Sequence, residues 1–255
     1  MLDLEAIAAR LDDAALHARA TPQLAEALTL EEAYRVQACL LERRYLRGER
    51  RVGIKMGFTS RAKMAQMGID DVIWGRLTDA MQVANGGQID LASFVHPRVE
   101  PEIAFLLSAP LGGRVTPAEA LAAVGGVAPA LEIIDSRYRD FKFSLTDVVA
   151  DNSSSAAFVV GSWSAPETDL SSLAMTLHID GVARQVGSSS AILGDPILSL
   201  IAAARLAHEA GDPLRSGDIV LAGGATAAEP LDAGQRIHLD VEVLGQASFS
   251  VGPAS

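Results

Sequence analysis

The hydrophobic pattern changes character near residue 50, and this change constrains the fold more than any other feature of the chain. Apolar residues recur at helical spacing through 4–15. A second helix is predicted after Thr29, because Glu32 lies three residues further on and completes a capping box. From 52–59 the sequence is instead punctuated by glycine and has the composition of a strand. The pattern therefore predicts helices first and β-structure afterwards.

Beyond Phe94 the chain consists mostly of short strand-like segments joined by turns, with few helices. Long strands do not alternate regularly with helices, which disfavours a doubly wound sheet or a TIM barrel. With 255 residues, 49% of them hydrophobic, the chain can bury a sizeable core. We therefore expect an α+β fold in a single domain, 1–255, with a helical N-terminal part at 1–50 packed on a mixed or antiparallel β core at 51–255.

Charge and composition exclude several classes of protein. The net charge of −11 argues against a nucleic-acid partner, because phosphate binding needs clustered lysine and arginine. The first residues carry no basic segment ahead of an apolar one, and no apolar run approaches the ~18 residues of a membrane span. We expect a cytoplasmic protein without a membrane partner. The single cysteine, Cys39, is interpreted as a small buried hydrophobe.

Three glutamates interrupt apolar segments and form a candidate metal site. Glu100 and Glu102 are two residues apart, so on a strand they point to the same side, where their charges repel unless a cation lies between them. Glu132 interrupts a similar apolar segment at 129–135. Three carboxylate ligands suit Mg²⁺ or Mn²⁺. The alternative is that these acids face solvent from amphipathic strands.

Lys55 lies in an apolar, glycine-rich segment at 53–58. A desolvated lysine there could transfer a proton or neutralise a carboxylate. The alternative is a lysine whose stem is buried and whose ammonium group reaches solvent.

Several ordered blocks resemble a known family along most of the chain. The blocks lie at 53–60, 75–79, 97–105, 129–137, 150–155, 193–196 and 214–224. Together they resemble the 2-oxopent-4-enoate hydratase and 4-oxalocrotonate decarboxylase group of the fumarylacetoacetate hydrolase superfamily. The resemblance implies a β-roll core and a single catalytic domain that acts on a small 2-oxo acid.

The resemblance also assigns roles to individual residues. The metal ligands of the family correspond to Glu100, Glu102 and Glu132, which implies Mg²⁺ or Mn²⁺. The active-site lysine corresponds to Lys55 and a nearby acid to Asp79, which we expect to be its partner.

The stretch that helps hold the 2-oxo acid in the family corresponds to 151–155, with Ser153 in place of the usual alanine. Within it, Ser153, Ser154 and Ser155 are assigned to substrate binding. Gly224 is assigned to the same substrate-binding set.

The reaction is predicted from segments that distinguish decarboxylases from hydratases. The segments at 61–68, 109–111, 135–143 and 223–226 resemble the decarboxylase versions. They imply decarboxylation of 4-oxalocrotonate (2-oxo-3-hexenedioate) to 2-hydroxypenta-2,4-dienoate. The alternatives are a 2-oxopent-4-enoate hydratase and a non-catalytic partner subunit of a hydratase complex. We expect a homo-oligomer, and association with a paralogous hydratase is consistent with the family.

Overall fold

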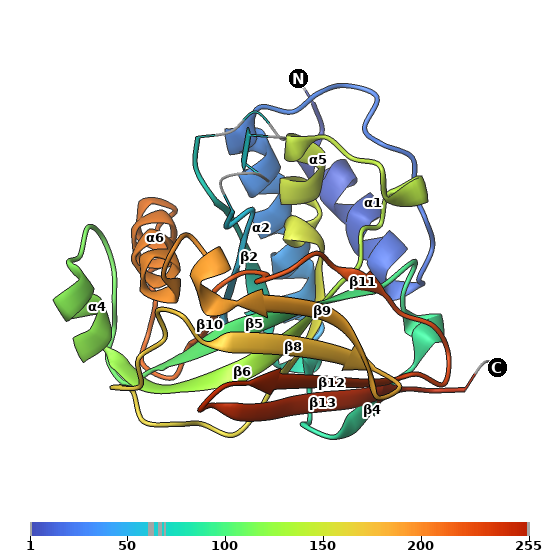
Figure 1. Cartoon of the computed structure of the whole chain (residues 1–255). Helices are drawn as coiled ribbons and strands as arrows, with labels where there is room; N and C mark the ends of the chain where they lie inside the picture. Colours follow the sequence, from blue (N-terminus) through green and yellow to red (C-terminus); the bar gives the residue numbers. More distant parts are fainter. Residues whose placement is uncertain (1, 61–63, 66–67, 69, 254–255) are drawn as a thin grey trace.

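The computed structural model describes residues 2–60, 64–65, 68 and 70–253. Helices α1 (Leu4–Leu16), α2 (Leu30–Leu46) and α5 (Leu145–Ala150) form a layer on one side of two β-sheets (Figure 1). The capping box predicted after Thr29 is present, because the Thr29 hydroxyl accepts from the Glu32 backbone and the Glu32 carboxylate accepts from the Thr29 backbone. The sequence also predicts a short helix at 60–67, and this segment falls largely outside the described residues.

The larger sheet is mixed and has the strand order β2-β1-β10-β5-β6-β7-β3, with β11 also paired to β5. Its strands are β1 (Arg51–Gly57), β2 (Ile73–Thr78), β3 (Gln82–Val83), β5 (Arg98–Leu107), β6 (Val124–Ile134), β7 (Ser155–Val160), β10 (Ile219–Leu221) and β11 (Glu229–Pro230). β1 pairs in parallel with β10, whereas the pairs β1–β2, β5–β6 and β6–β7 are antiparallel.

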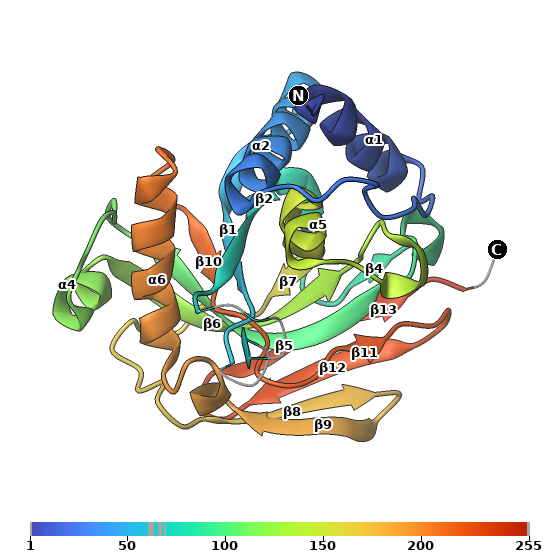
Figure 2. The same cartoon turned by 90° about the horizontal axis from the view of Figure 1, so that it is seen from above.

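The smaller sheet has the order β4-β13-β12-β8-β9 and crosses below the larger one in the view of Figure 1. Its strands are β4 (Gly87–Ile89), β8 (Ala174–Ile179), β9 (Val182–Ser188), β12 (Arg236–Val241) and β13 (Gly245–Val251). Helices α4 (Pro117–Ala122) and α6 (Pro196–Glu209) lie together beside the sheets, away from the N-terminal helices (Figure 2).

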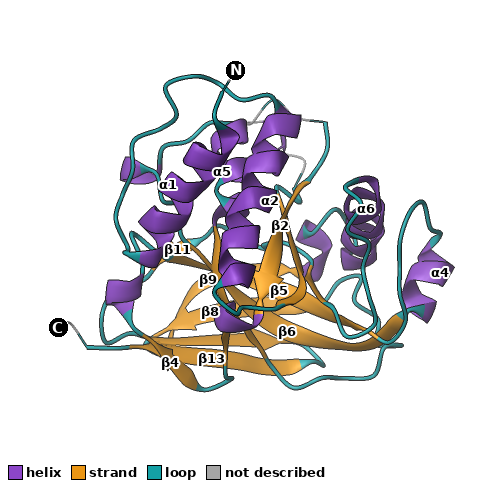
Figure 3. Ribbon diagram, turned by 180° about the vertical axis from the view of Figure 1, so that it is seen from behind, coloured by secondary structure: helices purple, strands orange, loops and turns teal. Residues whose placement is uncertain are grey.

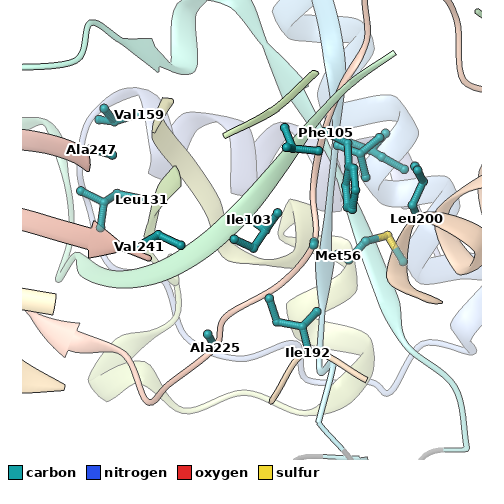
Figure 4. Packing of buried hydrophobic residues seen from close by; sticks show 14 of the residues in the cluster. Met56, Ile103, Phe105, Leu131, Val159, Ile192, Leu200, Ala225, Val241 and Ala247 are labelled. Carbon is teal, nitrogen blue, oxygen red and sulfur yellow. The ribbon is translucent and has the colours of Figure 1, made fainter. Parts of the chain in front are cut away.

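The main hydrophobic core lies between the two sheets. Successive side chains of a strand point to opposite faces, and the odd-numbered residues of β5 and β6 point towards the smaller sheet. Figure 4 shows Leu131 of β6 beside Val241 and Ala247 of the smaller sheet, with Ile103 of β5 nearby, and all belong to one buried cluster. The even-numbered residues of β5 and β6 are therefore left to face the opposite side.

The larger sheet curls on itself and closes at the short helix η4 (Asn152–Ser154), which leads into β7. The Asn152 side chain accepts from the Arg76 backbone N–H and donates to the Arg76 carbonyl, joining β2 to the start of β7. Gly75 permits this approach, because a Cβ atom there would lie 2.5 Å from the Asn152 carbonyl oxygen. The even-numbered side chains thus point into a rolled interior.

The N-terminal helices pack on the outside of this roll, as seen from behind in Figure 3. Leu11 of α1 and Leu41 of α2 are fully buried in a cluster that also contains Ile73 of β2 and Val149 of α5. The prediction of an α+β fold, with a helical N-terminal part on a mixed β core, is confirmed. Among the residues that the structure describes, no helix has the length and apolarity to cross a membrane.

Candidate active site

The antiparallel pairing of β5 with β6 brings the three predicted glutamates together. Glu100 lies directly opposite Glu132 in the register, and Glu102 lies two residues further along β5 on the same face. One carboxylate oxygen from each residue lies within 4.8 Å of the other two. The three side chains extend into the rolled interior, next to an apolar cluster that contains Ala104 and Ala130.

This triad is a buried concentration of negative charge. Glu102 and Glu132 are fully buried. Burial raises the pKa of the Glu102 carboxyl well above its ordinary value, and the charge of Glu132 raises it further. Burial likewise raises the pKa of Glu132, although Lys55 opposes the effect. Two buried acids with raised pKa values are a set of groups that a bound cation would stabilise in the ionised form.

An unsatisfied oxygen in the triad fits the same conclusion. Glu102 Oε2 accepts a 2.7 Å hydrogen bond from the backbone N–H of Gly223. Glu102 Oε1 is buried and has no hydrogen-bond partner among the described residues. A buried carboxylate oxygen without a donor is costly, and a divalent cation bound by oxygen ligands would remove that cost. The donor set therefore fits a hard divalent metal.

Lys55 crosses the interior of the roll from β1 to reach the triad. Its ammonium nitrogen lies 3.0 Å from Glu132 Oε2 and donates a 3.0 Å hydrogen bond to the carbonyl of Ser153. Burial acts to lower the pKa of Lys55, but the charges of the three glutamates outweigh it and raise the pKa. Lys55 is therefore held as a cation, and its contacts exclude the alternative in which its ammonium group reaches solvent.

The turn at η4 has an unusual backbone. Asn152, Ser153 and Ser154 have φ values of 48°, 52° and 58°, a run of left-handed residues without glycine. Each such residue costs of the order of 1–2 kcal/mol relative to the right-handed form. Phe58, another residue with positive φ, lines the same cavity as Ser153 and Ser154. Strained conformations of this kind concentrate at functional sites.

The three predicted serines differ in what their hydroxyl groups do. Ser153 Oγ donates to the Trp74 carbonyl, and Ser155 Oγ donates a 3.0 Å hydrogen bond to Glu132 Oε1. Ser154 Oγ is buried with no hydrogen-bond partner among the described residues. The hydroxyl available to a ligand is therefore that of Ser154, while Ser155 orients a carboxylate of the triad.

Gly224 has a steric reason to be glycine. A Cβ atom at this position would lie 2.9 Å from Glu100 Cδ and Oε2. The absence of a side chain lets the backbone pass directly over the Glu100 carboxylate. The structure thus places Gly224 beside the triad, and its assignment to the substrate-binding set stays a prediction.

A cavity of about 580 Å³ opens onto these groups. Lys55, Glu100, Ser153 and Ser154 form its polar end. Its other walls are mostly apolar and aromatic, and they include Phe58, Ile73, Ile134, Phe141, Phe143 and Val148, together with the basic residue Arg98. A small organic acid of a few carbon atoms fits a pocket of this size and character.

The expected partnership of Lys55 with Asp79 is wrong in this structure. Asp79 begins the short helix η1 (Asp79–Met81), and its carboxylate accepts hydrogen bonds from the backbone N–H and Nε of Arg50. It does not line the cavity. The residue that pairs with Lys55 is Glu132, because β1 and β6 face each other across the roll while Asp79 lies beyond the end of β2.

The segments that favoured decarboxylation lie in different places. The segment 135–143 reaches the cavity through Phe141 and Phe143, whereas 109–111 does not line it. Most of 61–68 lies outside the described residues.

Arg98 and Phe58 are cavity residues that the sequence reasoning missed. Arg98 could have been found from its position two residues before Glu100, which places it on the same face of β5.

The rolled sheet and the carboxylate triad define a known class of protein. The sequence profile described as Fumarylacetoacetate (FAA) hydrolase C-terminal matches residues 54–251. The chain belongs to the fumarylacetoacetate hydrolase family.

Individual relatives within this family include decarboxylases and hydratases. The chain is 59% identical to a 4-oxalocrotonate decarboxylase from Pseudomonas sp over 98% of both proteins. It is 35% identical to a 2-hydroxyhexa-2,4-dienoate hydratase from Comamonas testosteroni, covering 87% of this chain and 86% of that protein. Its structure is similar to that of 4-oxalocrotonate decarboxylase from Pseudomonas putida G7 complexed with magnesium and adipate, with a TM-score of 0.94, 36% identity and 97% of each chain covered. The resemblance found in the sequence is confirmed.

Proposed function

We propose that this chain is a lyase that decarboxylates 4-oxalocrotonate to 2-hydroxypenta-2,4-dienoate and CO₂, a step in the degradation of aromatic compounds by meta-cleavage. The observation that carries the proposal is the triad of Glu100, Glu102 and Glu132, in which Glu102 and Glu132 are buried and Glu100 lines a mostly apolar cavity beside Lys55. The 59% identity to a protein of that activity supports it.

The metal in this proposal is Mg²⁺ or Mn²⁺, held by Glu100, Glu102 and Glu132. The similar structure from Pseudomonas putida G7 contains magnesium, which agrees with the oxygen ligands offered here. When bound, the cation would supply Lewis-acid stabilisation of the negative charge that develops on the 2-oxo oxygen of the substrate.

The residues of the chain bind and orient the substrate for loss of its distal carboxyl group. The C5–C6 bond breaks, CO₂ leaves, and the electron pair moves through the conjugated carbons to the 2-oxo oxygen. Lys55 holds a proton at Nζ beside this end of the cavity, where it can balance or protonate the enolate oxygen. Ser154 offers its hydroxyl, which has no other partner in the described part of the chain, to the 1-carboxylate. The apolar side chains of the walls offer no hydrogen bond to a water, which decarboxylation does not need.

The second candidate function is a hydratase acting on 2-hydroxypentadienoate. The similarity to the Comamonas testosteroni hydratase favours it, and hydration needs the same stabilised enolate. Hydration additionally needs a positioned water and a proton donor near C4 and C5. The walls formed by Phe141 and Phe143 at the cavity disfavour such a water.

One experiment separates these functions. Purified protein with Mg²⁺ or Mn²⁺ is incubated with 2-oxo-3-hexenedioate and, separately, with 2-hydroxypentadienoate. We expect CO₂ release from the first. Consumption of the second alone would identify a hydratase. No turnover of either would favour the non-catalytic partner subunit, against which the intact Lys55 and glutamate triad count.

We further propose that residues 1–255 act as a single catalytic domain, because the buried cluster around Leu11 and Leu41 joins the N-terminal helices to β2. We expect the protein to work in the cytoplasm as a homo-oligomer that can associate with a paralogous hydratase. Size measurement alone and after mixing with that hydratase tests both expectations.

A further inference from the structure

Arg98, the first residue of β5, lines the cavity. Of the cavity residues on this strand, it lies furthest from the buried Glu102. We propose that Arg98 binds the distal carboxylate of the substrate and so selects 2-oxo diacids over 2-oxo monoacids. This inference rests on the proposed function, because it names the residue that recognises the group which the reaction removes. It concerns binding rather than the chemical step.

The strand geometry places Arg98 at a suitable distance from the triad. Arg98, Glu100 and Glu102 occupy alternate positions of β5 and therefore share one face. Two residues of a strand advance roughly 6.6 Å, so Arg98 begins about that far along the cavity from Glu100. The two carboxyl carbons of an extended six-carbon diacid are separated by roughly 6 Å at ordinary carbon–carbon bond lengths. A substrate with its 2-oxo end at the triad thus extends its other end towards Arg98.

The guanidinium group of Arg98 is oriented for a ligand rather than for a protein carboxylate. Its Cζ atom lies 4.5 Å from the centroid of the Phe141 ring. Stacking occupies one face of the planar group and leaves its N–H edge available. No ion pair joins Arg98 to a carboxylate within the part of the chain that the structure describes. This contrasts with Arg44, Arg51 and Arg137, each of which is paired with a carboxylate.

The surroundings strengthen the interaction of Arg98 with an anion. Ile134 lies opposite Arg98 in the strand register and lines the cavity together with Phe141 and Phe143. An apolar wall lowers the local dielectric constant, and a charge-assisted hydrogen bond is stronger there than in water. Arg98 is half-buried, so its charge is only partly screened by solvent.

The decarboxylation step determines whether the contact of Arg98 with the distal carboxylate affects binding or the chemical step. The carboxylate that Arg98 holds departs as neutral CO₂, while the electron pair of the broken bond moves away towards the 2-oxo oxygen. Arg98 therefore stabilises the bound substrate and does not act as the electron sink. Its loss should raise KM for the diacid with a small effect on kcat. The monoacid product has no distal charge and leaves without breaking this contact.

The test compares binding of two unreactive 2-oxo acids to the Mn²⁺-loaded protein by calorimetry. The probes are 2-oxoadipate, which keeps the distal carboxylate, and 2-oxohexanoate, which ends in a methyl group. We expect the wild type to bind 2-oxoadipate about 10- to 100-fold more tightly, the value of one or two charge-assisted hydrogen bonds. In Arg98→Gln the two affinities should become equal within about threefold, with that for 2-oxohexanoate unchanged.

The matched control is Arg139→Gln, which removes the same charge from an exposed position two residues before Phe141. It should retain the preference of the wild type. Phe141→Leu keeps the arginine but removes its stacking surface, and it should reduce the preference in part. Thermal unfolding of each variant shows whether it is folded. If Arg98→Gln does not fold, Phe141→Leu still tests the proposal.

Two outcomes would overturn the proposal. Equal affinity of the wild type for the two probes would show that the distal carboxylate is not recognised. An equal loss of both affinities in Arg98→Gln would place Arg98 at the shared 2-oxo end. Failure of the proposed function is distinguishable, because it would appear as no CO₂ release from 2-oxo-3-hexenedioate whatever the probes bind.

Discussion

Replacing Glu102 with glutamine should have opposite effects on stability with and without metal. The side chain is fully buried, and its Oε1 atom has no hydrogen-bond partner among the described residues. Glutamine has the same shape and can keep its carbonyl oxygen at the Gly223 N–H, which now bonds Oε2. Its amide nitrogen would then replace Oε1 and could donate to the neighbouring carboxylates. The substitution removes one charge from a cluster whose oxygens lie within 4.8 Å.

The size of the stability change without metal follows from the unpaired Oε1 atom of Glu102. The size of the change with metal follows from the coupling of metal binding to folding. A buried polar group without a partner costs about 1–3 kcal/mol, so the metal-free Glu102→Gln protein should be more stable than the wild type by that amount. For a chain of this length, each kcal/mol corresponds to a Tm shift of roughly 2–4 °C. Metal at 100 times its Kd should stabilise the wild type by about 2.7 kcal/mol, and the variant by much less.

The assay is thermal unfolding at pH 8 after chelator treatment, repeated with excess Mg²⁺ or Mn²⁺. Glu167→Gln, at an exposed position, is the control for loss of one carboxylate. We expect Glu102→Gln to have the higher Tm without metal and the lower Tm with it, and to lose metal-dependent turnover. An equal metal response in both proteins would refute Glu102 as a ligand. A lower Tm of the metal-free variant would refute the argument from the unpaired oxygen.

Three further predictions test the supports of the site. Ser155→Ala removes the hydrogen bond to Glu132 and should weaken metal binding about 10- to 100-fold by calorimetry; unchanged affinity would mean that the hydroxyl does not orient this ligand. Gly224→Ala places a Cβ atom 2.9 Å from the Glu100 carboxylate, whose flexible end must move. Metal affinity should therefore fall at least about tenfold, while Tm without metal changes little. A large loss of Tm without metal would indicate backbone strain instead. Burial raises the pKa of Asp151 to about 6 from 3.8 despite an adjacent guanidinium. Because the folded pKa is the higher, this contribution to stability is full below pH 3.8 and is lost as pH rises through 6. Asp151→Asn should lack that decline between pH 4 and 7 in urea unfolding, and a constant difference from the wild type over this range would contradict the assignment.

The sequence predicted the triad because its physical basis is local. Acids at alternate positions of an apolar strand must share a face whatever the rest of the chain does, so Glu100 and Glu102 could be placed together from their spacing. That Glu132 lies opposite Glu100 depends on the register of β5 with β6, which spacing does not determine. The family resemblance supplied this information.

The parts of the site that could not be predicted depend on how the sheet curls. Lys55 and Glu132 lie on strands separated by β10 and β5, and they meet only because the sheet closes. The same curvature leaves Asp79 outside the cavity with Arg50, contrary to the expectation that it partners Lys55. The different hydrogen bonds of Ser153, Ser154 and Ser155 depend on the left-handed backbone at 152–154, which the side chains do not encode.

The alternation of apolar and acidic side chains along β5 links the position of the acids to the correct register of the strand. Odd positions such as Val99 and Ile103 pack against the smaller sheet, and the even positions Glu100 and Glu102 carry the acids. A slip of one residue would exchange these two sets and bury the carboxylates in the hydrophobic cluster between the sheets, at a high cost in desolvation. A chain with the wrong register of β5 is therefore unstable. The folded protein has its acids on the face of β5 that points towards the cavity.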